Sequence, residues 1–173
     1  DRRTTHIDSS VATHAPRLAG RGYFVIEPNY RGSDNLGNAY KAALFQDAGA
    51  GPGRDVMAGL AQLKRGGMID TNRIGVSGWS YGGYMTVWLL GHYPAQWQAA
   101  VAGAAVTDWL DQYHLGDSNV QRAAAICPSP WLSEANYPTH PEQPPITLAG
   151  LLRTPPPPPP HTPHPPAPPP HAP

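Results

Sequence analysis

The sequence predicts an α/β fold with a doubly wound, mostly parallel sheet. Short apolar runs that suit buried strands alternate with segments of helical spacing between residues 23 and 105. This β-α-β-α-β order is typical of parallel sheets with right-handed crossovers. A serine in a Gly-rich turn joins one predicted strand to the next helix. Prolines set the C-terminal region apart, since 16 of the 23 lie in residues 141–173.

The first part of the foldable region is predicted to contain one strand between helices. Residues 18–22 suit a helix end, because glycines interrupt the pattern. Residues 23–28 form a compact apolar run that ends at Pro28, as a buried strand would. A short helix is expected over residues 36–47. Residues 52–63 keep one apolar helical face and are followed by two glycines that stop the helix; the residues concerned are Val56, Met57, Leu60, Leu63, Gly66 and Gly67.

The second part is predicted to be a strand, a helix and a strand. The β-branched run over residues 73–77 suits a buried strand, residues 81–92 have helical spacing, and residues 98–105 form the next strand. The carboxyl ends of parallel strands share one edge of a sheet, where ligands bind. We therefore expect the loop of residues 29–33, Ser80 and the loop of residues 107–109 to lie at that edge.

Ser80 stands in the motif Gly78-Trp79-Ser80-Tyr81-Gly82, which has the pattern G-x-S-x-G of a nucleophile elbow. Such a turn strains the serine backbone, and side chains at Gly78 and Gly82 are expected to collide across it. No lysine follows the glycines, which excludes a phosphate-binding P-loop. The other interpretation is a serine in a Gly-rich turn that carries no chemistry.

The elbow predicts two roles in acyl transfer. Ser80 is the candidate nucleophile, and its hydroxyl needs an adjacent base to remove the proton. The backbone N–H of Tyr81, at a helix N-terminus, is the candidate donor to the oxyanion that forms on the attacked carbonyl.

The motif and its neighbours resemble the prolyl oligopeptidase family of serine peptidases, in its dipeptidyl peptidase IV and acylaminoacyl peptidase branches. The residues that carry the resemblance span about residues 17–113, and four segments match in order: residues 21–33 with the sequence Asn-Tyr-Arg-Gly-Ser at their end, residues 55–60, residues 78–85 and residues 99–109. The resemblance implies a partial α/β-hydrolase catalytic domain over residues 1–140. The Pro-rich residues 141–173 are predicted to form a disordered tail, because prolines lack the backbone donors of helices and sheets.

The resemblance also implies a function. We expect a serine peptidase that hydrolyses short peptides through an acyl-enzyme on Ser80, with an apolar substrate pocket made by Tyr81, Val106, Trp109 and Tyr113. An aromatic residue at position 113 also suits plain core packing. Two alternatives remain: an esterase of the same fold, and a non-catalytic scaffold whose polyproline arm binds SH3 or WW domains.

The acid and the base of the expected triad are not evident in the sequence. The resemblance places the acid in a G-x-x-D turn near position 160, which here lies within the prolines of residues 155–160. The H-G-G-P type motif that would supply the second oxyanion donor is also not found. Asp108 is kept as an alternative acid, and His114 and His140 are expected at the surface. We therefore expect an incomplete catalytic domain with poor activity.

Composition excludes several other classes of function. The 12 basic residues balance the 12 acidic ones, and no basic stripe indicates nucleic-acid binding. The sequence contains no run of about 18 apolar residues, the length that a membrane-spanning helix requires. The single cysteine, Cys127, excludes an intramolecular disulfide and slightly favours the cytoplasm. Cys127 stands outside any Cys/His spacing typical of a metal site, and neither a metal nor a cofactor is predicted.

Overall fold

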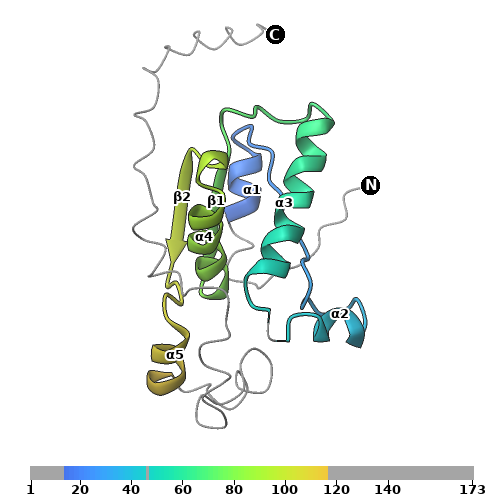
Figure 1. Ribbon diagram of the computed structural model, residues 1–173. Coiled ribbons are helices and arrows are strands. Elements are labelled where there is room, and N and C mark those ends of the chain that lie inside the picture. Colours follow the sequence, from blue (N-terminus) through green and yellow to red (C-terminus); the bar gives the residue numbers. More distant parts are fainter. Residues whose placement is uncertain (1–13, 46, 117–173) are drawn as a thin grey trace, which may run out of the picture.

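A computed structural model describes residues 14–45 and 47–116 of the chain (Figure 1). The predictions for Cys127, for His140 and for residues 141–173 lie outside these residues. The elements, in chain order, are α1 (His14–Ala19), α2 (Asn38–Ala42), α3 (Ala50–Arg65), β1 (Gly75–Trp79), α4 (Tyr81–His92), the 3-10 helix η1 (Pro94–Gln96), β2 (Ala99–Gly103) and α5 (Trp109–Leu115).

The sheet of the described residues is parallel, as predicted. β1 pairs with β2 in a register that runs from Gly75 opposite Ala99 to Trp79 opposite Gly103. α4 connects the two strands and lies across them on one side (Figure 1). On the other side the sheet is open among the described residues, and the Trp79 side chain there is 60% exposed.

The core forms where α4 meets the sheet and α3. The buried apolar residues of α4 are Tyr84, Met85, Trp88 and Leu89, and Leu60 of α3 joins the same cluster. α3 approaches α4 closely because Gly53 has no side chain, and a Cβ there would overlap the Trp88 ring. Thr86, the one buried polar side chain of the described core, donates a hydrogen bond of 2.9 Å to the Gly82 carbonyl oxygen.

One predicted element is wrong. Residues 23–28 form no strand, and the Tyr23, Phe24 and Ile26 side chains are exposed. A strand exists only when its backbone groups bond to a neighbouring strand. Among the described residues the sheet has just β1 and β2, so this segment has no partner to pair with.

Other elements have different ends from those predicted. The helix expected over residues 36–47 shrinks to Asn38–Ala42, whereas the helix expected over residues 52–63 extends to Ala50–Arg65. β1 begins at Gly75 rather than at residue 73, since the Ile74 N–H donates to the Gln98 side chain at 2.7 Å. β2 ends at Gly103, because Ala104 has a φ of 44° and leaves the extended conformation.

Within the described ranges, no helix combines the length and the apolar content that crossing a bilayer requires.

Candidate active site

The turn between β1 and α4 holds Ser80 in a strained conformation. Ser80 has a φ of 56° and a ψ of −115°, which is uncommon for a residue with a side chain. Its N–H donates a 2.9 Å hydrogen bond to the Gly103 carbonyl oxygen, and its own carbonyl accepts the first helical bond, from Tyr84, at 3.0 Å. The serine is thus fixed to the end of β2 and to the start of α4. These are the features of a strand–nucleophile–helix turn.

The glycines of the motif do not contribute equally. A Cβ on Gly78 would overlap the backbone of Gly82, as predicted. The matching prediction for Gly82 is wrong, because a Cβ there would meet nothing within 4 Å. Gly82 lies in the first turn of α4. Its backbone faces Gly78, whereas a Cβ on Gly82 would point away from Gly78. Gly83 is the second close contact, since a Cβ there would lie 2.6 Å from the Gly103 carbonyl oxygen.

Tyr81 begins α4, and its side chain reaches back to the segment before α3. Its hydroxyl donates a 2.5 Å hydrogen bond to the carbonyl oxygen of Ala48. Its ring stacks on that of Tyr84, with centroids 5.6 Å apart. The backbone N–H of Tyr81 lies in the first turn of α4, at the N-terminal end of the helix. The dipole of α4 favours negative charge at this end.

Three rings surround Tyr81. The centroids of Tyr30 and Trp109 each lie 6.2 Å from that of Tyr81, and Tyr84 and Trp109 are 4.9 Å apart. The Trp109 indole N–H is buried and has no hydrogen-bond partner in the described part of the chain. The structure therefore brings two of the predicted pocket residues, Tyr81 and Trp109, into one aromatic cluster.

The other two predicted pocket residues are placed differently. Val106 is buried as part of the core cluster. It also lines a shallow hollow of about 280 Å³ between the end of β2 and α5, together with Ala105, Thr107, Asp108, Asp111, Gln112, Leu115 and Gly116. Tyr113 is a residue of α5, but its side chain lies outside the described part of the structure.

Asp108, the alternative acid, and the histidines His92 and His114 have other surroundings. Asp108 accepts a 3.3 Å hydrogen bond from the Asp111 N–H, at the start of α5. His92 stacks on Trp88 with centroids 3.8 Å apart, at the opposite end of α4 from Ser80. Twelve helical residues span on the order of 18 Å, so His92 cannot be the base. His114 is exposed on α5, as expected. None of the described residues is thereby assigned as base or acid.

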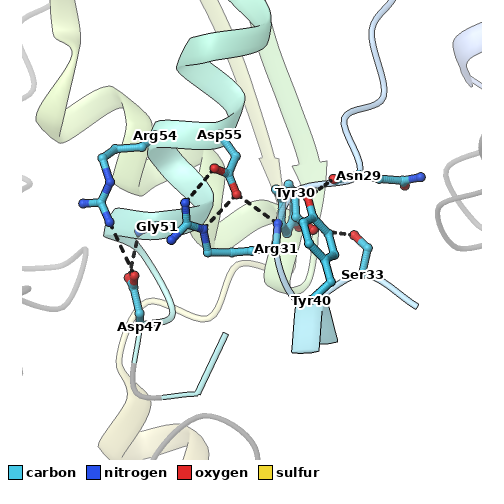
Figure 2. A network of polar contacts seen from close by, with 9 residues as sticks. All are labelled: Asn29, Tyr30, Arg31, Ser33, Tyr40, Asp47, Gly51, Arg54 and Asp55. Atoms are coloured by element: carbon cyan, nitrogen blue, oxygen red, sulfur yellow. Dashed lines mark hydrogen bonds and ion pairs between the residues drawn. The ribbon is translucent and has the colours of Figure 1, made fainter. Parts of the chain in front are cut away.

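A polar network beside the aromatic cluster was not anticipated from the sequence (Figure 2). Arg31 forms a salt bridge of 2.8 Å with Asp55 of α3, and the Asp47 side chain accepts from the Gly51 N–H at 2.8 Å. The hydrogen bond from Arg31 holds the pKa of Asp55 below its usual value, and the same bond raises the pKa of Arg31. Arg31 and Asp55 are 24 residues apart, so periodicity could not pair them.

The same network organises the loop of residues 29–33. The Tyr40 hydroxyl donates to the Asn29 carbonyl oxygen, and the Ser33 hydroxyl donates to the Tyr30 carbonyl oxygen, both at 2.7 Å. Burial raises the pKa of the Tyr30 phenol. The loop lies against the aromatic cluster through Tyr30, which agrees with its expected place at the edge of the site.

Comparisons with known proteins agree on one family. The family model described as "Prolyl oligopeptidase family" matches residues 9–147. The uncharacterized peptidase YuxL of Bacillus subtilis is 37% identical over 101 residues, which is 58% of this chain and 15% of that protein. Dipeptidyl-peptidase 5 of Porphyromonas gingivalis is 33% identical over 96 residues, or 56% of this chain and 14% of that protein.

A solved structure extends the likeness to the fold. The uncomplexed acylaminoacyl peptidase of Pyrococcus horikoshii superposes with a TM-score of 0.63 and 25% identity, over 72% of this chain and 20% of that one. An acylaminoacyl peptidase in complex with Z-Gly-Gly-Phe-chloromethyl ketone gives the same values. The fold is therefore that of an α/β-hydrolase peptidase. This chain spans only 15% of YuxL and 14% of dipeptidyl-peptidase 5.

Proposed function

The chain belongs to the prolyl oligopeptidase family, and on that premise we propose that it carries the nucleophile of a serine peptidase that cleaves short peptides through an acyl-enzyme on Ser80. The observation that carries the proposal is the backbone conformation of Ser80. This residue lies between the end of β1 and the N-terminus of α4 and has a φ of 56°. A non-glycine residue keeps such a conformation only when the surrounding structure imposes it, and such strain clusters at active sites.

In the proposed reaction, Ser80 Oγ attacks the carbonyl carbon of the scissile peptide. A general base takes the hydroxyl proton as the O–C bond forms, and negative charge moves to the carbonyl oxygen. The C–N bond then breaks, the amine leaves with the proton, and water hydrolyses the acyl-enzyme. In this proposal Ser80 supplies the nucleophile, and none of the described residues is proposed as the base or as the acid that orients it.

Tyr81 is proposed to stabilise the oxyanion through its backbone N–H. Its place in the first turn of α4 supports this role, because the N–H groups there point out of the helix end and the dipole favours an anion. Losing one oxyanion donor costs about 3–4 kcal/mol of transition-state stabilisation in enzymes of this kind.

The substrate pocket is proposed to lie at the aromatic cluster, with Tyr81 and Trp109 as its rings and Val106 and Tyr113 as further members. Tyr81 directly follows the proposed nucleophile in the chain, and its ring centroid lies 6.2 Å from that of Trp109. The related acylaminoacyl peptidase binds Z-Gly-Gly-Phe-chloromethyl ketone, a peptide-like compound with an apolar aromatic residue beside its reactive group. A pocket lined by aromatic rings suits such a residue.

Labelling with a fluorophosphonate probe tests the nucleophile. The 173-residue chain, Ser80→Ala and Ser77→Ala are incubated with the probe, and the adduct is located by peptide mass spectrometry. Ser77 is the control because it is an exposed serine of β1. We expect slow labelling that maps to Ser80, persists in Ser77→Ala and disappears in Ser80→Ala. Equal labelling of Ser80→Ala would overturn the proposal.

Substrate pairs separate the alternatives. A short peptide p-nitroanilide and a p-nitrophenyl ester with the same acyl part are compared in the same three proteins. Ser80-dependent release from both supports the peptidase. Release from the ester alone supports an esterase, and no Ser80-dependent adduct or release supports a non-catalytic scaffold.

A further inference from the structure

Three hydrogen bonds between Arg31 and Asp55 join the loop of residues 29–33 to α3 (Figure 2). The backbone N–H and the Nε of Arg31 donate to Asp55 Oδ2 at 3.0 and 2.9 Å, and a terminal guanidinium nitrogen donates to Oδ1 at 2.8 Å. The two side chains are 30% and 28% exposed, so water competes only in part. Because the carboxylate binds both the main chain and the guanidinium fork, it fixes the position and the orientation of the loop.

The loop held in this way reaches the residue after the proposed nucleophile. Tyr30 precedes Arg31, and its ring lies 6.2 Å from the Tyr81 ring. A second contact to Tyr81 comes from the segment before α3, where the Ala48 carbonyl accepts from the Tyr81 hydroxyl. Asp47, next to Ala48, bonds to the Gly51 N–H and lies 3.6 Å from Arg54, the neighbour of Asp55.

Tyr81 is therefore held on two sides by parts of the chain that Asp55 and its helix organise. The ring and the backbone N–H of Tyr81 share one Cα, so a ring that cannot rotate or shift also restrains the N–H. A misplacement of about 1 Å can cost a catalytic step on the order of a hundredfold.

We propose that Arg31 and Asp55 are positioning residues for the oxyanion donor: their ion pair holds the loop of residues 29–33 against α3, and through Tyr30 and Ala48 it sets the place of Tyr81 and its N–H. The inference rests on the proposed function of Ser80 and Tyr81. The pair acts through Tyr81 and touches no reacting atom.

Two measurements on the 173-residue chain test the pair. The first is the rate of Ser80 phosphonylation by the fluorophosphonate probe, in which the O–P bond forms, the P–F bond breaks, fluoride leaves and the hydroxyl proton passes to solvent. Saturation kinetics separate the probe's reversible binding from this covalent step. The second is the backbone signal of Tyr81 in a spectrum of the chain labelled with ¹⁵N-tyrosine, identified by its loss in Tyr81→Phe.

Two variants of Arg31 are used. Arg31→Met removes the charge and the guanidinium group but keeps a long side chain. Arg31→Lys keeps the charge without the guanidinium group. Lys41→Met is the matched control, because Lys41 pairs with Asp34 at 2.7 Å on the surface, where the side chains are 64% and 71% exposed. All proteins are compared well below their melting temperatures. We expect Arg31→Met to slow the covalent step at least tenfold and to move the Tyr81 signal. Arg31→Lys should recover only part of the wild-type rate. The rate of Lys41→Met should stay within twofold of wild type.

A folded Arg31→Met that reacts at the wild-type rate with an unmoved Tyr81 signal would overturn the proposal and leave the pair a purely structural contact. If Arg31→Met does not fold, the same measurements are made on Asp55→Asn and Tyr30→Leu. Asp55→Asn weakens the contact with Arg31, and Tyr30→Leu removes the ring contact with Tyr81. Failure of the proposed function is separate: the wild-type chain then shows no Ser80-dependent adduct, while the Tyr81 signal still reports whether the pair positions it.

Discussion

Gly78 of β1 lies directly against the backbone of Gly82 in α4. A methyl group on Gly78 would overlap the Gly82 carbonyl group and Cα, whereas a methyl group on Gly82 would enter open space. The close approach lets α4 begin immediately after Ser80 and lets the Ser80 N–H reach the Gly103 carbonyl oxygen. The two glycines of the motif therefore differ in what they contribute, although the sequence pattern treats them alike.

Gly78→Ala is expected to destabilise the chain, and Gly82→Ala is the matched control. Forcing a methyl group into packed backbone costs about 1–3 kcal/mol, which corresponds to a fall in melting temperature of roughly 4–8 °C per kcal/mol in a domain of this size. Alanine at Gly82 should be neutral or slightly stabilising, because alanine is the better helix former. Thermal melts followed by circular dichroism check both, and equal melting temperatures for the two variants would contradict the asymmetry.

The contact between Gly53 and Trp88 gives a second pair of variants in α3. A Cβ on Gly53 would overlap the buried Trp88 ring, whereas a Cβ on Gly59 would meet only the end of the Ile26 side chain, at 3.3 Å. Gly53→Ala should cost about 1–3 kcal/mol in the free energy of unfolding. Gly59→Ala should stabilise by roughly 0.5–1 kcal/mol through the lower entropy of the unfolded chain. Urea unfolding measures both variants. A Gly53→Ala variant as stable as wild type would show that α3 can move away from α4 without cost.

The Arg31–Asp55 pair predicts a loss of stability in acid. Arg31 lowers the pKa of Asp55 in the folded protein, with Arg54 acting in the same direction. A group with a lowered pKa stabilises the folded state fully above its unfolded pKa, about 3.9, and loses that contribution as the pH falls through the folded pKa. The difference in unfolding free energy between wild type and Asp55→Asn should therefore be constant from about pH 7 to 5 and should shrink below about pH 4.

Urea unfolding at a series of pH values measures this difference, and Asp34→Asn is the control. Asp34 pairs with Lys41 at the surface, and exposed pairs contribute about 0–1 kcal/mol. The control difference should stay near zero at every pH. A difference for Asp55→Asn that grows on acidification would contradict the lowered pKa.

Residues 154–173 are predicted to be dispensable for folding. This prediction comes from the composition alone, because those residues lie outside the described part of the chain and are largely proline. A segment of this kind lacks backbone donors and apolar side chains to bury. A chain that ends at Arg153 should melt within about 5 °C of the full chain, the shift expected for roughly 1 kcal/mol. A larger fall would show that the prolines pack on the domain.

The strand–turn–helix–strand unit could be read from the sequence because its signals are local. Residues 81–92 were predicted as a helix and are one, and β1 and β2 lie within two residues of the predicted strands. Ser80 was found through a five-residue motif whose strain and glycine contact depend on neighbours in the chain. Each of these features needs only periodicity and steric rules that act over a few residues.

Contacts between distant residues could not be read in this way. Nothing in the local pattern pairs Arg31 with Asp55 or Tyr81 with Ala48, which are 24 and 33 residues apart. The apolar run of residues 23–28 looks like a strand by itself and forms none, because a strand depends on a partner and not on its own composition. The sequence by itself determined the parallel β-α-β unit and the strained turn that holds Ser80, because short-range sterics decide both. The tertiary structure alone decided what holds Tyr81, since only packing brings α3 and the loop of residues 29–33 to the start of α4.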